Sequence, residues 1–276
     1  MITLKIVLED KKEQLQAEQY FKTQPQIDLY IEEKADKEQT GGGEEFLLRN
    51  GLVLSDMPEV CTYYIEKKAA VVAVLRDGRD YPGVRYAVTA WQDAEEDYLE
   101  KVYQRYHGLP WSICETKRCF IRETTVDDLE AFYKIYKERS ITKYMEDLFE
   151  DPEKERQYIR DYRDKVYAFY GFGMWTVCLK ETGEVIGRAG LSMREGFEDP
   201  ELGYMIAVPW QKKGLAEEVC REILQYGKDQ LGFEKIQVLM EAENTASEHL
   251  CRKLGFQFVE KQKIEKTMYD RYLLRY

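Results

Sequence analysis

The stretch AVPWQKKGLAEEVCREIL, residues 207–224, places two lysines and a glycine where a predicted strand passes into a predicted helix. Amide N–H groups in the first turn of a helix have no partner within the helix, and the helix dipole favours negative charge there. Gly214 and the small Ala216 would let a ligand approach the backbone, and Lys212 and Lys213 could donate hydrogen bonds to phosphate. The stretch therefore predicts a polyphosphate site, with an ordinary helix start and solvated lysines as the alternative.

The charge of the chain limits the classes of partner. The 276 residues carry a formal net charge of −11. Nucleic acids and anionic membranes favour a basic surface, so we predict neither as a partner, whereas a cationic amine would be attracted. No apolar run approaches the roughly 20 residues of a membrane helix, and the first residues lack the basic region and cleavage site of a signal peptide. We therefore predict a folded cytoplasmic protein.

The cysteines and histidines give no sign of a metal centre. The chain has six cysteines and two histidines, and none of the cysteines forms a CxxC pair. This pattern predicts neither a zinc site nor a disulfide framework. We expect free thiols in a reducing compartment and no metal.

The first part of the chain, residues 1–111, alternates strand-like and helix-like runs. Such alternation predicts an α/β domain with a mainly parallel sheet and helices on its faces. We expect strands at 2–8, 26–32, 46–56, 69–76 and 84–90, and helices at 11–22, 58–68 and 93–107. Residues 34–45 are polar and glycine-rich and predict a surface loop. Gly108 suits a helix C-cap and Pro110 follows it, so we place the domain boundary after residue 111.

The second part, residues 112–276, predicts an α+β domain with a mixed sheet. Thr125 and Asp128 have the spacing of a capping box at the start of its first helix. Two strands flank the turn ETGE within residues 173–195. We expect the remaining strands at 119–124, 200–208, 235–243, 256–266 and 268–276, and later helices ending near 230 and spanning 246–255.

Residues 211–216, QKKGLA, resemble the Q/R-x-x-G-x-G/A signature of the GNAT superfamily of N-acetyltransferases. The longer segments ELGYMIAVPWQKKGLAEEVCREIL and EAENTASEHLCRKLGFQF resemble the ribosomal-protein N-acetyltransferase-like branch of that superfamily. The resemblance covers residues 119–276 and is specific for fold and cofactor, but much less specific for substrate. It implies a mixed, splayed sheet and acetyl-CoA as the cofactor.

The resemblance also implies a role for individual residues. The strand from Glu201 would separate from the strand of residues 235–243, and the pantetheine arm of acetyl-CoA would lie in the gap. The amides of residues 213–216 would bind the pyrophosphate. Asn244 matches the asparagine that reaches the pantetheine, and it could also cap the next helix. The implied cofactor-binding residues are Ile206, Ala207, Val208, Gln211, Lys212, Lys213, Gly214, Leu215, Ala216, Asn244, Ser247 and Cys251.

The catalytic residues follow less directly from the resemblance. Acetyl transfer to an amine needs a path for the amine proton and a proton donor for the leaving thiolate. Many family members have a tyrosine at the position of Cys251, which is either a proton donor or a buried small hydrophobe. Ser247 is the alternative donor. Glu201 is the first candidate for the base and Tyr204 the second, and His249, which we expect to face solvent, receives no role.

The N-terminal domain resembles a response-regulator receiver domain in its acidic residues. Glu9 and Asp10 follow the first predicted strand, and Asp56 ends the third. The hydroxyl and lysine expected after the later strands are missing. A degenerate Rossmann-like or haloacid-dehalogenase-like domain fits equally well, with Ser55 or Asp56 as a relic or a helix cap. We expect a non-catalytic module that docks beside the transferase or binds a regulator.

Together these observations predict an acetyl-CoA-dependent N-acetyltransferase that works by direct attack of an amine on the thioester. The acceptor is open between a protein N-terminus or lysine and a small amine. Residues 138–175, rich in tyrosine and in both charge signs, are expected to form its binding wall or simply an amphipathic packing face. The alternative function is a non-catalytic acyl-CoA-binding regulatory module, because a cysteine replaces the usual tyrosine. The oligomeric state is open, with a dimer as one option.

Overall fold

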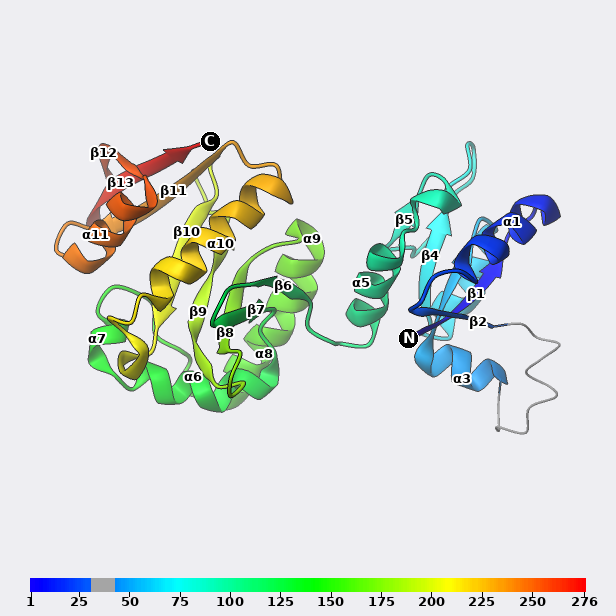
Figure 1. Cartoon of the computed structure of the whole chain (residues 1–276), viewed down its shortest axis with the longest axis horizontal. Helices are drawn as coiled ribbons and strands as arrows, with labels where there is room; N and C mark the ends of the chain where they lie inside the picture. Colours follow the sequence, from blue (N-terminus) through cyan, green and yellow to red (C-terminus); the bar gives the residue numbers. More distant parts are fainter. Residues whose placement is uncertain (31–42) are drawn as a thin grey trace. The chain divides into compact units, whose positions relative to one another are not determined.

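The computed structural model describes residues 1–30 and 43–276 (Figure 1). It divides the chain into two compact units, Met1–Trp111 and Ser112–Tyr276. Each unit has its own hydrophobic core, so we describe them separately. No helix among the described residues is long and apolar enough to cross a membrane.

The first unit is a parallel sheet with helices on both faces, as its alternating sequence predicts. Its strands are β1 (Ile2–Val7), β2 (Ile27–Leu29), β3 (Gly51–Ser55), β4 (Ala70–Val74) and β5 (Ala87–Val88). Its helices are α1 (Lys11–Phe21), α3 (Gly43–Asn50), α4 (Pro58–Glu66) and α5 (Glu96–Tyr106). The strand order is β2-β1-β3-β4-β5, and all the strands are parallel. The chain adds β2 on one side of β1 and the later strands on the other side, which is the doubly wound arrangement. One apolar cluster lies between the sheet and α1 and α5, and another lies between the sheet and α3 and α4.

The predicted strand at 46–56 is wrong in its first half. Helix α3 covers residues 43–50, and only Gly51–Ser55 form a strand. Two glutamates in the first turn of α3 and Arg49 in its last turn complement the helix dipole, and Arg49 pairs with Glu45 at 2.7 Å. Residues 43–45 of the predicted surface loop belong to this helix, whereas residues 34–42 lie outside the described residues. The predicted strand at 84–90 is reduced to β5.

The second unit contains a mixed sheet of eight strands. The strands are β6 (Ser112–Glu115), β7 (Cys119–Arg122), β8 (Met174–Leu179), β9 (Val185–Ser192), β10 (Glu201–Ile206), β11 (Lys235–Glu241), β12 (Gln257–Ile264) and β13 (Thr267–Arg275). Their order is β12-β13-β11-β10-β9-β8-β7-β6. Within this sheet β10 and β11 are parallel, and the other neighbouring strands are antiparallel.

Helices cover both faces of this second sheet. They are α6 (Leu129–Tyr136), α7 (Arg139–Thr142), α8 (Pro152–Tyr162), α9 (Ala168–Tyr170), α10 (Leu215–Asp229) and α11 (Thr245–Leu254). The predicted capping box before α6 is confirmed, because the Thr125 amide donates to Asp128 Oδ2 at 2.9 Å. Successive side chains of β10 point to opposite faces of the sheet. Leu202 and Ile206 pack with α10, whereas Met205 packs with α6 and α7.

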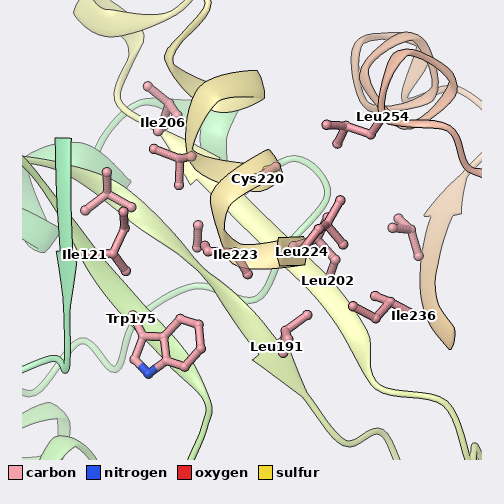
Figure 2. Close-up of a cluster of buried hydrophobic side chains, with 14 of the residues drawn as sticks. Ile121, Trp175, Leu191, Leu202, Ile206, Cys220, Ile223, Leu224, Ile236 and Leu254 are labelled. Carbon is pink, nitrogen blue, oxygen red and sulfur yellow. The ribbon is translucent and has the colours of Figure 1, made fainter. Parts of the chain in front are cut away.

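The main apolar core lies beneath α10. Figure 2 shows Ile223 and Leu224 of this helix directed at side chains of the sheet, among them Leu191 of β9 and Trp175 of β8. Trp175 has no exposed surface. This packing fixes α10, and therefore its first turn, against the end of β10.

Candidate active site

The strands β10 and β11 separate almost at their start. Glu201 and Gln237 are the one Cα pair recorded between them, and the Gln237 amide donates to the Pro200 carbonyl at 2.8 Å. β10 otherwise pairs with β9, and β11 pairs with β13 over its whole length. Parallel neighbours normally bond along their whole length. The two strands therefore diverge and leave a gap with open backbone edges, as the sequence resemblance implies.

The turn between β10 and α10 ends in an amide cradle, which we define as the backbone of residues 213–216. Gly214 is the N-cap of α10 and has φ +78°, a left-handed conformation that favours glycine. Within the described residues, the amides of the cradle donate no hydrogen bond. Four free N–H groups at the start of a 15-residue helix can bind an anion.

The two lysines of the turn are exposed at the surface. Lys213 Nζ lies 4.3 Å from the centre of the Trp210 ring, so this side chain stacks on its neighbour. Lys212 has φ +59°, which is unusual for a residue with a side chain. The Gln211 side chain donates to the Ile206 carbonyl at 2.9 Å. It thus bonds a main-chain acceptor that the resemblance assigns to the pantetheine arm.

Arg118, in the turn between β6 and β7, contacts this turn, and the sequence reasoning missed it. Its Nη1 donates to the Lys213 carbonyl at 2.9 Å, and its Nε and backbone amide donate to the Glu218 carboxylate at 2.7 and 2.8 Å. Its Nη2 lies 3.6 Å from the position of a Cβ on Gly214. The guanidinium therefore holds the turn in place and adds positive charge beside the cradle. Arg118 is about a hundred residues away in the chain, so no local pattern indicates it.

Four predicted site residues come together on the α10 and α11 side of the gap. The Tyr204 hydroxyl donates to Ser247 Oγ at 3.0 Å, and the Ser247 amide donates to Oδ1 of Asn244, the N-cap of α11. Cys251 follows one helical turn later and is fully buried. Burial raises the pKa of the Cys251 thiol to about 12 and raises the pKa of Tyr204 above its usual value. Both groups are therefore neutral near pH 7, and Cys251 packs as a small hydrophobe.

Glu201 lies on the opposite face of β10, because it is three positions from Tyr204 and side chains alternate between faces along a strand. Its carboxylate pairs with Arg194 Nη1 at 3.1 Å. Burial raises the pKa of Glu201, while Arg194 and the Leu239 amide oppose that rise. The structure thus separates the first candidate base from the candidate proton donors. His249 is exposed, as expected from the sequence.

The described residues contain no cluster of three or more His, Cys, Asp or Glu side chains that could hold a metal ion. All six cysteines are free. The polar groups that the structure places around the gap include the Glu201 carboxylate, the hydroxyls of Tyr204 and Ser247, and the backbone amides of the cradle.

Comparison with known proteins agrees with this geometry. Residues 118–257 match the model of the acetyltransferase (GNAT) domain family. YoaA of Bacillus subtilis strain 168, an uncharacterized N-acetyltransferase, is 29% identical over 148 residues, which are 52% of this chain and 82% of that protein.

Two solved structures have the same fold at low sequence identity. The ribosomal-protein-S5-alanine acetyltransferase of Vibrio fischeri is 14% identical with a TM-score of 0.51, covering 60% of this chain and 96% of its own. Mycobacterium smegmatis RimJ, solved in complex with CoA-disulfide, is 14% identical with a TM-score of 0.51, covering 61% and 88%. At these identities the likeness establishes the fold of the second unit, a mixed sheet that splays at its centre.

Proposed function

Because the chain belongs to the GNAT acetyltransferase family, we propose that it transfers the acetyl group of acetyl-CoA to an amine by direct attack on the thioester. The observation that carries this proposal is the combination of two features. Beyond Glu201 and Gln237 no backbone pairing among the described residues joins β10 to β11, and β10 is followed by a helix start with four unbonded amides.

The residues present fit acetyl-CoA. A side chain at Gly214 would be strained at φ +78° and would occupy the face of the cradle, so the glycine keeps this backbone accessible. In our proposal the amides of residues 213–216 bind the pyrophosphate, with Arg118 beside them. The pantetheine arm would lie along Ile206, Ala207 and Val208 and reach the side chain of Asn244.

Acetyl-CoA supplies an activated acyl group, whose carbonyl carbon the amine nitrogen attacks as the carbon–sulfur bond breaks. The nitrogen must lose a proton and the sulfur must gain one. We assign the first proton to the Glu201 carboxylate, whose raised pKa makes it a better base than an exposed glutamate. We assign the second to the Ser247 hydroxyl, because Tyr204 donates to Ser247 Oγ and leaves the serine's own proton available. Positioning and backbone amides supply the rest of the rate.

A calorimetric titration of acetyl-CoA tests the cradle. We expect binding by the parent protein and its loss in Gly214→Glu, which places bulk and negative charge on the cradle. Gly232→Glu is the matched control, because Gly232 also has positive φ, +70°, near the other end of α10, with no atom close to its Cβ position. Equal affinity in Gly214→Glu and Gly232→Glu would contradict the proposed cradle.

Thiol release with a panel of amines and peptides then tests the transfer itself. We expect release of coenzyme A together with acetylation of the acceptor nitrogen, measured by mass spectrometry. Tight binding of acetyl-CoA with no turnover of any amine would favour the alternative, a regulatory module that binds the cofactor without catalysis.

A further inference from the structure

Arg188 lies on the same face of the sheet as Glu201, the base of the proposed function. It is on β9, paired with Met205 of β10 and with Thr176 of β8. Residues paired across strands point to the same face, and Met205 packs with α6 and α7. Arg188 is thus on the opposite face from α10, α11 and the cradle.

The guanidinium of Arg188 has no carboxylate partner. Its Nε atom is buried without a hydrogen bond, and within the described part of the chain the residue forms no ion pair. Its neighbours are aromatic, since Cζ lies 5.1 Å from the centre of the Phe132 ring and the phenols of Tyr136, Tyr162 and Tyr167 surround it. Arginine stays protonated, and buried charges in proteins are normally paired.

Two other arginines of the same sheet region show the usual arrangement. Arg122 forms a bidentate pair with Asp128, and Arg194 pairs with Glu201. Arg188 therefore differs from these two arginines because aromatic side chains, and no carboxylate of the described residues, surround its guanidinium. A group missing from the protein itself can be supplied by a ligand.

Arg188 lies close to the gap, because its pairing partner Met205 is on β10, one of the two strands that border the gap. Gly203 lies two residues before Met205 on the same face of β10, which is about 7 Å along the strand. With no side chain at Gly203, the nearest atom to its Cβ position is the flexible Met174 Sδ at 3.1 Å. An acceptor whose nitrogen reaches the gap near Gly203 can therefore extend its other end toward Arg188 over a short distance.

We propose that Arg188 binds a carboxylate of the acceptor, so that the substrate is an amine that also carries a carboxylate. This inference rests on the proposed function and narrows its substrate class. The planar guanidinium can hold a carboxylate through two parallel hydrogen bonds. The Tyr162 hydroxyl accepts the Met174 amide at 2.9 Å and keeps its own proton as a further donor. Exclusion of water by the aromatic rings strengthens these contacts.

Matched pairs of acceptors test the inference. In the first kind of pair, a free amino acid is compared with its C-terminal amide. In the second kind, a tripeptide that contains Asp or Glu is compared with the same tripeptide containing Asn or Gln. We expect the parent to prefer the carboxylate member by at least about tenfold in kcat/KM, which corresponds to one good charge-assisted contact. Arg188→Gln should abolish the preference and Arg188→Lys should retain part of it, because lysine keeps the charge without the fork. The two kinds of pair distinguish a free amino acid from an acidic peptide.

Arg160→Gln is the control, because it removes an exposed arginine from the last turn of α8. Its preference should equal that of the parent. Equal kcat/KM for both members of every pair in the parent would overturn the inference. So would an Arg188→Gln variant that loses activity equally on both members, because the arginine would then act without regard to the carboxylate.

A second measurement does not depend on turnover. A half-buried cation without an anionic partner destabilises the unliganded protein, so Arg188→Met should raise the Tm of the second unit by roughly 2–4 °C. A fall in Tm would assign Arg188 to the fold and overturn the inference. If acetyl-CoA does not bind to the parent, the proposed function is wrong. The Tm of Arg188→Met still tests the inference in that case, because it reports whether Arg188 stabilises the fold.

Discussion

Replacement of Ser247 by alanine is the change that most directly tests how the leaving thiolate receives its proton. Ser247 lies in the first turn of α11 and accepts the Tyr204 hydroxyl at 3.0 Å, so its own proton is free to point into the gap. Cys251, where family members often have a tyrosine, is fully buried and has a pKa of about 12 because of that burial. The geometry therefore favours the serine over the cysteine as the donor.

The expected magnitudes differ among the three side chains. A positioned proton donor contributes about 10²–10⁴ in rate, so Ser247→Ala should lower kcat and kcat/KM together by about 10². Tyr204→Phe removes the hydrogen bond that orients the serine, which is worth about 1 kcal/mol, so kcat should fall by about fivefold. Cys251→Ala should change kcat by less than about threefold, while the lost buried sulfur lowers the free energy of unfolding by about 1 kcal/mol.

The assay is steady-state thiol release with the best acceptor, together with urea unfolding of each variant. The double variant Tyr204→Phe/Ser247→Ala should be no slower than Ser247→Ala, because the tyrosine acts through the serine. A Cys251→Ala variant that loses 10² in kcat while Ser247→Ala retains full activity would refute the assignment.

Three further predictions concern the same unit. Gly187→Ala would place a Cβ 2.1 Å from the Met205 carbonyl oxygen, so β10 must move by about 1 Å and urea unfolding should show a loss of about 3 kcal/mol. Burial raises the folded-state pKa of Glu201, so the folded protein binds the proton more tightly and its stability falls as pH rises from the unfolded pKa through the folded one. Glu201→Gln should remove this pH dependence, measured as Tm against pH. Asn244→Ala deletes the N-cap that accepts the Ser247 amide and should cost about 1 kcal/mol in urea unfolding, and an added loss of acetyl-CoA affinity would support the pantetheine contact.

The sequence predicts those features that depend on short segments. The motif at residues 211–216 identifies the family, and the alternation of residues 1–111 predicts a parallel sheet with helices on both faces; the comparisons and the structure confirm both. The predicted strand at 46–56 is wrong in its first half because FLLRN is short and apolar enough for either a helix or a strand. The glutamates that precede it belong to the first turn of α3 rather than to the predicted loop.

Features that depend on strand pairing could not be predicted in this way. Arg118 contacts the cradle from the turn between β6 and β7, which is distant in the chain. Arg188 is significant because of the aromatic side chains around it and the carboxylate that it lacks. Glu201 and Tyr204 are three positions apart in a strand, so the sequence already places them on opposite faces. The sequence does not show which helices cover each face, and this decides which other groups each of them meets. The catalytic assignments stay predictions.

The acidic residues of the first unit are used internally. Asp56 is 2% exposed and accepts hydrogen bonds from the Glu9 amide at 2.9 Å and from Arg76 Nε at 3.0 Å. Arg76 also pairs with Glu13, and Arg79 pairs with Glu9. Two arginines thus stand at the carboxyl end of the sheet, among the acidic side chains that the receiver-like comparison assigns to a phosphorylation pocket.

The other residues of that comparison also have local roles. Asp10 is the N-cap of α1 and accepts the amides of Lys12 and Glu13. The Ser55 hydroxyl donates to the Val7 carbonyl at 2.7 Å, and Met57 is the N-cap of α4, so neither Ser55 nor Asp56 occupies the cap position itself. These contacts favour a structural ion cluster over a phosphate acceptor.

We therefore predict that Asp56→Ala lowers the free energy of unfolding of the first unit by about 2–3 kcal/mol. The cost of breaking a buried pair is about 3–5 kcal/mol, but it is reduced here because Arg76 is 31% exposed and keeps Glu13 as a partner. Asp56→Asn should lose less, since its amide oxygen still accepts the Glu9 amide. Intact mass spectrometry after incubation with acetyl phosphate and Mg²⁺ should show no phosphorylation. A phosphorylated species that disappears in Asp56→Asn would mean that Arg76 leaves the pocket, and the acidic residues would then act as they do in a receiver domain.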